Sequence, residues 1–338
     1  MAHTSRHYAL IALQIIVALI LFALFLSLYK YTEGLLINEC EGKATRDMER
    51  IQLTIQREMM KAESAAHAFS SLVFQDGQNL PKDSSQLYRR IEQFLSSMPS
   101  TITGAIIGFE DGVYPQYEEQ WGFIPLIRHV DGQFVRYQMG AERDVRVLHD
   151  WYRETRREQK ERWAEPQLAE EGEAICGYCI PLRDVNNSFI GVLEVDFSME
   201  RMAEEVCSIK PYPNAEPLVV NNDDSLTVLM SSDPQNVLNH NMHSLLRQRG
   251  LSFERSVFES VRSGQSRYHL LRQGDFRDRH EVYFFHMPEP HTGWIIQMTC
   301  PTSDVTSALE ALKVRMGFIA LTIILLIALV ALTYLRYS

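Results

Sequence analysis

The chain has 338 residues, which is enough for two ordinary domains, and 46% of them are hydrophobic, as in folded proteins. The formal net charge of −10 provides no basic surface and argues against nucleic acid as a partner. The sequence contains no phosphate-binding loop, H-E-x-x-H or G-x-S-x-G motif, so nothing in it favours an enzyme.

Two uncharged apolar segments predict membrane helices. They are Tyr8–Tyr29 and Met316–Leu335, and each has about the 20 apolar residues that a helix needs to cross a bilayer. The first is too long for a typical signal-peptide core, so we expect an uncleaved anchor. Two spans would place residues 1–7 and 336–338 on one side of the membrane and the bulk of the chain on the other.

Residues 30–75 are expected to form one long stalk helix. Apolar residues recur there in steps of three and four, the spacing of an amphipathic helix. The stripe consists of Met48, Ile51, Ile55, Met59, Ala62, Ala66, Phe69 and Val73. It is suited to pairing with a second copy of the chain or to covering a sheet, and the sequence leaves both open.

Residues 76–208 form a first predicted unit of helices and strands. Its elements are a helix at Tyr88–Met98, strands at Thr101–Phe109 and Phe134–Met139, a short helical piece carrying Trp151, Tyr152 and Trp163, a hairpin of Ala174–Leu182 and Phe189–Phe197, and a helix at Ser198–Val206. The hairpin turn is the sequence Asp184-Val185-Asn186-Asn187-Ser188.

Residues 209–304 form a second, smaller predicted unit. It begins after the proline-rich Lys210–Asn214 and has strands at Glu216–Val220, Leu226–Met230, Arg267–Arg272, Glu281–Met287 and Trp294–Thr299, with a helix at Ser252–Ser263. A helix over residues 305–335 then leads into the second span at 316–335. The whole is an α+β protein with two units in series.

The order of these elements, together with WY…WxEP…YxxPLxD…IGVLEVDFS in the first unit, resembles the double Cache domain. This is the extracytoplasmic sensor module of bacterial chemoreceptors, sensor kinases and phosphatases. The resemblance covers nearly all of residues 30–304. It implies two tandem PAS-like Cache units, each an antiparallel sheet with flanking helices, on a long N-terminal helix. It also implies a two-pass protein of the bacterial cytoplasmic membrane, with the sensor region periplasmic or extracellular.

The amino-acid-binding branch of that family has a pocket signature of Arg-x-Trp-Tyr, then Glu-Pro-Tyr-x-Asp, then an Asp in the last strand. Trp151, Tyr152, Glu165, Pro166 and Asp196 match it. The Arg position holds His149, the Tyr position Gln167 and the second Asp position Ala169. Because a histidine cannot grip a carboxylate with two parallel hydrogen bonds, the resemblance favours a small polar or amine-like ligand over an α-amino acid.

Eight residues are therefore the ligand-binding candidates: His149, Arg146, Trp151, Tyr152, Trp163, Glu165, Tyr178 and Asp196. Aromatic side chains supply large rigid pocket walls, and a carboxylate amid apolar residues needs a partner or a ligand. The alternative is structural: the aromatic side chains could belong to the core of a small domain, and Asp196 could form a structural ion pair. Arg143 and Arg146 are candidates to replace the missing arginine.

Neither a metal nor a cofactor is expected. The pair His240 and His243 lacks a Cys or carboxylate at a suitable spacing, and His280, His286 and His291 are scattered. Cys176 and Cys179 resemble a redox CxxC motif, but in a strand they point to opposite faces, about 10 Å apart. A disulfide of one of them with Cys207 is conceivable from composition alone, and five cysteines leave at least one unpaired.

Three functions follow as hypotheses. The first is a membrane-anchored sensor that binds a small molecule in the first unit and passes the signal to a cytoplasmic output domain or partner protein, as a homodimer through its long and transmembrane helices. The second is a membrane-anchored protein-binding or assembly module without a small-molecule ligand. The third is a thiol oxidoreductase acting through Cys176 and Cys179.

Overall fold

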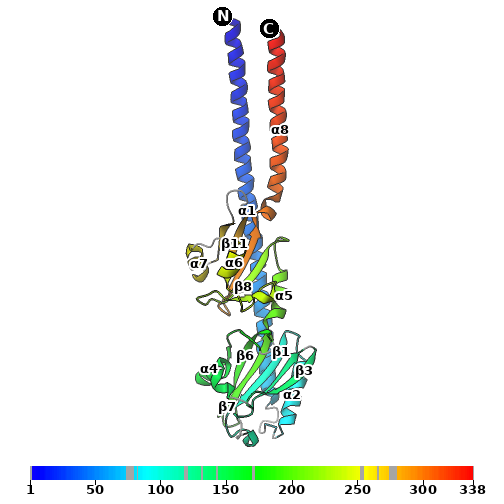
Figure 1. The fold of residues 1–338 in the computed structure, drawn as a ribbon, viewed down its shortest axis with the longest axis vertical. Coiled ribbons are helices and arrows are strands. Elements are labelled where there is room, and N and C mark those ends of the chain that lie inside the picture. The colour runs from blue at the N-terminus through cyan, green and yellow to red at the C-terminus, as the bar shows by residue number, and fades with distance from the viewer. Residues whose placement is uncertain are drawn as a thin grey trace.

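The computed structural model describes residues 2–73, 80–81, 83–117, 121–130, 132–141, 144–169, 172–251, 255–264, 266–273 and 280–337. The molecule is elongated, with two sheet-containing units stacked along one long helix and both termini at the same end (Figure 1). The helix α1 (Ala2–Val73) starts the chain and α8 (Thr302–Tyr337) ends it, and the two run side by side beyond the second unit. The α+β class and the two tandem antiparallel sheets are as predicted.

The apolar stripe of α1 is buried from Met48 to Phe69, as its periodicity predicts, and it covers both sheets. Met48, Ile51, Ile55 and Met59 lie in the core shared with the second sheet. Ala66 and Phe69 lie in the core of the first sheet, where the rings of Phe69 and Phe94 stack with centroids 4.3 Å apart. One helix therefore supplies part of the core to both units.

The first sheet is antiparallel throughout, with the order β3-β2-β1-β7-β6-β4 and with β5 also paired to β6. Its strands are β1 (Ile102–Phe109), β2 (Pro125–Val130), β3 (Gln133–Gln138), β4 (Arg162–Trp163), β5 (Gln167–Leu168), β6 (Ala174–Arg183) and β7 (Phe189–Ser198). The strands β1, β6 and β7 confirm the predicted positions, and β3 lies within one residue of its prediction. The strand β2 was missed.

Short helices surround this sheet. They are α2 (Ser84–Ser96), η1 (Pro115–Tyr117), α3 (Val145–Leu148), α4 (Asp150–Glu158) and α5 (Met199–Ser208). Trp151 and Tyr152 are on α4 as predicted, but Trp163 is on β4, so placing it on the same helical piece was wrong. The helix α4 ends at Glu158 because Gln159 takes the left-handed conformation, with φ of 55°.

The second sheet has the order β10-β11-β12-β8-β9, again antiparallel. Its strands are β8 (Glu216–Val220), β9 (Val228–Met230), β10 (Arg267–Gln273), β11 (His280–Pro288) and β12 (Ile295–Pro301), and its helices are η2 (Pro234–Asn236), α6 (Met242–Gln248) and α7 (Arg255–Arg262). On the face away from α1, a separate core of Phe284, Leu245, Val261 and their neighbours lies under α6 and α7. The helix α6 was missed.

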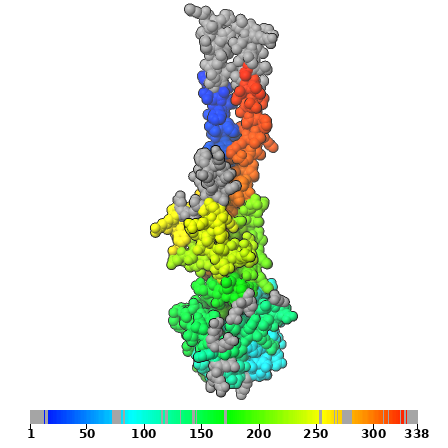
Figure 2. All heavy atoms as spheres, viewed as in Figure 1, coloured from blue at the N-terminus to red at the C-terminus, as the bar shows by residue number. Residues whose placement is uncertain are grey.

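Both predicted membrane segments lie inside continuous helices. Among the described residues, one helix is long and apolar enough to cross a membrane, and it is α1 near the N-terminus. The segment Met316–Leu335 lies in α8, and its role as a second span stays a prediction. The space-filling view shows these two helices projecting as a narrow rod from the wider units (Figure 2).

A candidate ligand-binding cavity in the first unit

Two acids on β7 point to the face of the first sheet that is opposite α1. Successive side chains of a strand alternate between faces, so Leu193 and Val195 pack toward α1 while Glu194 and Asp196 face the other way. Both carboxyl groups are buried, with 2% and 1% of the residue surface exposed. A buried carboxyl group is costly unless it is paired, protonated or bound to a ligand.

Two glycines on the neighbouring strands make room for these acids. A Cβ at Gly177 of β6 would lie 1.8 Å from Glu194 Oε1, and a Cβ at Gly104 of β1 would lie 2.8 Å from Asp196 Oδ2. In the register, Gly104 and Gly177 are the direct partners of Asp196. Any side chain at Gly177 would therefore displace Glu194.

Arg128 on β2 pairs with Asp196. Its Nη2 donates to Asp196 Oδ2 at 2.7 Å, and the two side chains are 8% and 1% exposed. The arginine sits two strands from β7 and reaches across β1 at Gly104, whose lack of a side chain leaves the path open. Asp196 therefore has a structural partner. This agrees with the interpretation of Asp196 as a member of a structural ion pair.

The cavity lies beside this ion pair and has a volume of about 80 Å³. Its lining residues come from β1, β2, β3, α4, β5, β6 and β7 and from the segments around them: Ile106, Leu126, Arg128, Tyr137, Met139, His149, Trp151, Gln167, Leu168, Ala169, Ile175, Glu194 and Asp196. Leu168 is 47% exposed and marks the solvent side. The cavity is thus a small, mostly apolar space with charged groups on one wall.

Glu194 carries an unsatisfied oxygen on this wall. Its Oε1 is buried and has no hydrogen-bond partner among the described residues. Burial raises the pKa of the Glu194 carboxyl well above its usual range, and the neighbouring Asp196 carboxylate raises it further. The protonated form is therefore favoured until a donor or a cation reaches the oxygen.

Three predicted site residues meet in the cavity: His149, Trp151 and Asp196. Trp151 is buried in the core that also holds Ile106 and Leu126, and it forms one wall. The positions of the family signature that differ here, Gln167 and Ala169, also line the cavity.

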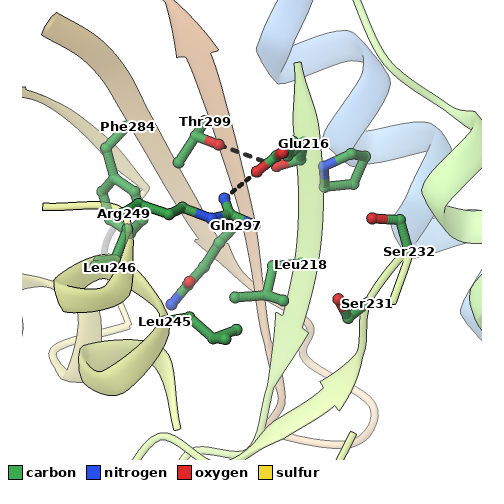
Figure 3. A pocket seen from close by; sticks show the side chains of 11 residues that line it. Glu216, Leu218, Ser231, Ser232, Leu245, Leu246, Arg249, Phe284, Gln297 and Thr299 are labelled. Carbon is green, nitrogen blue, oxygen red and sulfur yellow. Dashed lines mark hydrogen bonds and ion pairs between the residues drawn. The ribbon is translucent and has the colours of Figure 1, made fainter. Parts of the chain in front are cut away.

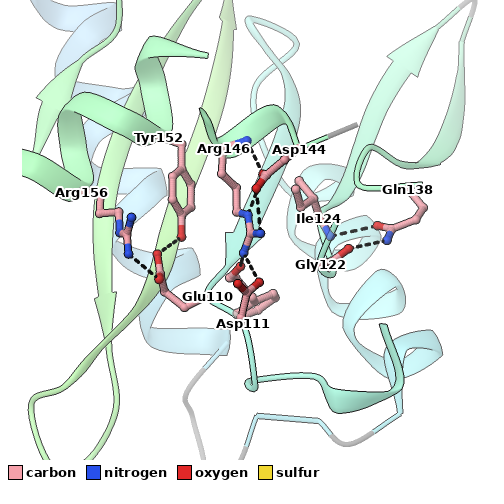
Figure 4. Close-up of polar contacts among 10 residues, drawn as sticks. Glu110, Asp111, Gly122, Ile124, Gln138, Asp144, Arg146, Tyr152 and Arg156 are labelled. Carbon is pink, nitrogen blue, oxygen red and sulfur yellow. Dashed lines mark hydrogen bonds and ion pairs between the residues drawn. The ribbon is translucent and has the colours of Figure 1, made fainter. Parts of the chain in front are cut away.

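Tyr152 and Arg146 do not line the cavity. Tyr152 packs on Gly108, where a Cβ would lie 2.7 Å from its ring, and its hydroxyl donates to Glu110 at 2.6 Å. The guanidinium of Arg146 donates to Asp144, Asp111 and the carbonyl of Phe109. Figure 4 shows both side chains in this polar network. Arg143, the other candidate arginine, lies outside the described residues.

Trp163, Tyr178 and Glu165 lie elsewhere too. Trp163 Nε1 donates to Glu63 of α1 at 2.9 Å, and Tyr178 is buried on the α1 side of the sheet, its ring centroid 5.1 Å from that of Trp163. Glu165 is exposed and accepts a hydrogen bond from Asn221 of the second unit. These residues join the first unit to α1 and to the second unit, and their prediction as ligand contacts has no support from this geometry.

Among the residues that line the cavity, sequence reasoning missed two charged ones, Arg128 and Glu194. For Glu194 a signal was present, because it shares the strand face of Asp196, two residues away. For Arg128 the signal was weak, because Leu126 and Ile127 are a short apolar run directly before it.

Comparisons with known proteins agree with this architecture. Residues 87–204 match the family model of the first PDC sensor domain of methyl-accepting chemotaxis-like proteins. No curated protein sequence matches the chain. The ligand-binding domain of the Campylobacter jejuni chemoreceptor Tlp3, solved with L-valine, is 12% identical and superposes with a TM-score of 0.57, covering 82% of this chain and 98% of that one.

Two further solved structures are similar. Methyl-accepting chemotaxis protein X is 15% identical with a TM-score of 0.56, covering 80% of this chain and 99% of that one. The ligand-binding domain of Mlp24 with asparagine is 14% identical with a TM-score of 0.52, covering 81% and 99%. The fold is that of a double Cache sensor domain.

A very small cavity lies in the second unit. It lies between β8 and α6 and measures about 20 Å³, with Glu216, Arg249 and Gln297 around it (Figure 3). A space of about 10–15 Å³ suffices for one water molecule. Gln297 Oε1 is buried with no hydrogen-bond partner among the described residues. The cavity therefore suits one water and not a metabolite.

The cysteines of the double Cache domain are unsuited to thiol exchange. Cys176 belongs to the core under α1 and Cys179 to the core on the opposite face, which confirms that they point apart. Burial raises the pKa of both thiols far above the usual range. None of the five cysteines forms a disulfide in the structure.

Proposed function

We propose that the chain is a membrane-anchored extracytoplasmic sensor that binds a small polar or amine-like ligand in the first unit. The single observation that carries this proposal is the cavity beside Trp151, with the buried and unpartnered Glu194 Oε1 on its wall. A buried polar oxygen without a partner costs about 1–3 kcal/mol, and a ligand that donates a hydrogen bond to it would recover that cost.

The charges of the wall favour a cation. Arg128 and Asp196 neutralise each other, and Arg162, the other cation that acts on Glu194, does not line the cavity. An ionised Glu194 would therefore give the cavity lining one net negative charge, partly offset by Arg162. An ammonium or amidinium group would supply both the hydrogen bond and the compensating charge. The volume of about 80 Å³ restricts the part of the ligand held here to a few non-hydrogen atoms. The neighbours solved with L-valine and asparagine support small nitrogenous ligands as a class.

Transmission would pass through β7 to α1. The strand carries Glu194 and Asp196 on its cavity face and Leu193, Val195 and Phe197 on its α1 face, so a displacement of the strand acts on both. A ligand can shift a two-state equilibrium only through different affinities for the two states. A ligand that contacts Glu194 more closely in one position of β7 than in the other would provide such a difference.

We further propose a homodimer through the outer face of α1. Leu53 and Met60 are 64% and 59% exposed, seven residues apart on the face away from both sheets. Together with Ala65, Ala68 and Met98, and with the polar residues Gln56, Arg57, Lys61 and Ser64, they line an open groove of about 730 Å³. A second α1 is the natural occupant, because the exposed Leu53 and Met60 would pair with the same residues of the second copy. Cysteine cross-linking at position 53 of a cysteine-free variant in native membranes tests it.

The ligand proposal is tested by calorimetry and thermal shift on the full chain in nanodiscs, with methylamine, guanidine, small diamines, amino acids, sugars and acetate as probes. A cationic compound should stabilise the protein, and Glu194→Gln should weaken its affinity at least tenfold. Glu165→Gln is the matched control, because Glu165 is exposed, and it should leave affinity unchanged. Stabilisation by acetate alone, or by no probe, would contradict a cation site and favour a protein-binding module.

A further inference from the structure

The second unit contains a pair of histidines that meet head to head. His269 of β10 and His286 of β11 lie on the sheet face away from α1, the face that carries the cavity in the first unit. Their Nε2 atoms are 3.3 Å apart, the ring planes differ by 7°, and the centroids are 5.4 Å apart. The two Nε2 atoms are thus close enough to share one proton or one ion.

A third donor completes a triangle. Ser260 Oγ of α7 lies 3.3 Å from His269 Nε2 and 3.4 Å from His286 Nε2. Two ligands held at about 2.0–2.1 Å from one Zn²⁺ in tetrahedral geometry are about 3.3–3.4 Å apart. The three edges thus have the length that a tetrahedral metal requires.

The burial of His286 sets this cluster apart from a surface histidine pair. The residue is 1% exposed, and its Nδ1 has no hydrogen-bond partner among the described residues, so its polar contacts there are those at Nε2. Neutral imidazole nitrogen is a common metal ligand. His269 is half-buried and leaves a route to solvent.

We propose that His269 and His286 bind one divalent transition-metal ion of the zinc, nickel or copper class, with Ser260 or water completing the shell. The nearby cation Arg267 disfavours ions held by charge alone, such as Ca²⁺ and Mg²⁺, whereas imidazole nitrogen prefers the later transition metals. No group of three His, Cys, Asp or Glu residues gathers in the described part of the chain, so the affinity rests on two imidazoles. The metal would hold α7 on the sheet and make the second unit a separate sensory input.

The test is zinc and cobalt titration of the full chain, purified in detergent with a tag free of histidine and stripped with a chelator. We expect one Zn²⁺ per chain by calorimetry and visible Co²⁺ absorption bands of a tetrahedral site. His269→Gln should weaken binding at least tenfold. His243→Gln on α6 is the matched control: this exposed histidine belongs to the other histidine pair of the sequence, and its loss should change nothing.

His286→Gln should weaken binding as His269→Gln does. Because His286 is buried, its replacement also disturbs the core. The decisive variant is therefore His269→Gln, at a half-buried position. Failure of the wild type to bind Zn²⁺ would overturn the proposal. So would unchanged affinity in His269→Gln, or loss of the site in His243→Gln. Each result is independent of whether the first unit binds an amine.

Discussion

Breaking the Arg128–Asp196 pair should destabilise the first unit more than breaking any exposed ion pair. Arg128→Met removes the guanidinium that donates at 2.7 Å and leaves Asp196, 1% exposed, without its partner beside Glu194. Removal of one partner of a buried pair costs about 3–5 kcal/mol, because a charge stays buried and uncompensated. At about 2–4 °C per kcal/mol for a unit of this size class, the midpoint should fall by roughly 10 °C.

The double variant Arg128→Met/Asp196→Leu should recover most of that loss, because two apolar side chains replace both charges. The matched control is Arg136→Met on β3, whose pair with Glu92 is bidentate but half-exposed, at 46% and 27%. We expect about 1 kcal/mol or less there.

The assay is hydrogen exchange of β1 and β7 amides, followed by mass spectrometry in detergent, with urea unfolding as a second readout. It compares the opening free energy of these strands among the wild type, both single variants and the double variant. If Arg128→Met costs no more than Arg136→Met, the pair is solvated and the cavity is not the closed site described here. The same conclusion would follow if the double variant Arg128→Met/Asp196→Leu were no more stable than Arg128→Met alone.

Three further outcomes are expected. Gly177→Ala should displace Glu194, whose Oε1 would lie 1.8 Å from the new methyl group, costing about 1–3 kcal/mol in urea unfolding, whereas Gly34→Ala, with open space around it, should not destabilise. Because the pKa of Glu194 is raised in the folded state, the native protein holds its proton longer, so stability should fall as pH rises above about 4.5; Glu194→Gln should flatten this slope in pH-dependent thermal melts. Cys176 and Cys179 should react with a thiol reagent only after denaturation, and rapid native labelling would revive the oxidoreductase hypothesis.

Much of the scaffold could be predicted because its signals are periodic. The α1 stripe from Met48 to Phe69 has the 3.6-residue period, and the hairpin of β6 and β7 is two long apolar runs around a turn-forming segment. Short or irregular elements gave weaker signals. The helix α6 starts with a capping box of Asn241 and Ser244, but it has only seven residues.

The cavity could be predicted only in part, because some of its residues lie on elements with a weak sequence signal. His149, Trp151 and Asp196 follow from the family signature, whereas Arg128 depends on β2, a strand of six residues that begins with Pro125. Trp163 was misplaced because α4 stops at Gln159, a non-glycine residue with positive φ, which no local pattern indicates. His269 and His286 are 17 residues apart, and only the β10–β11 register brings them together.

The two candidate ligand faces share a geometry that bears on signalling. Each lies on the side of its sheet away from α1, so a ligand in either unit can reach the helix only through the sheet. Glu63 of α1 is a point where both units meet: it accepts from Trp163 Nε1 of the first unit at 2.9 Å and lies 3.3 Å from His291 Nε2 of the second. Because both contacts are to the same oxygen, Glu63 Oε1, a displacement of this carboxylate changes both. A shift of the first sheet would therefore alter the hold of the second unit on α1, which couples the two inputs at one residue without direct contact between their ligands.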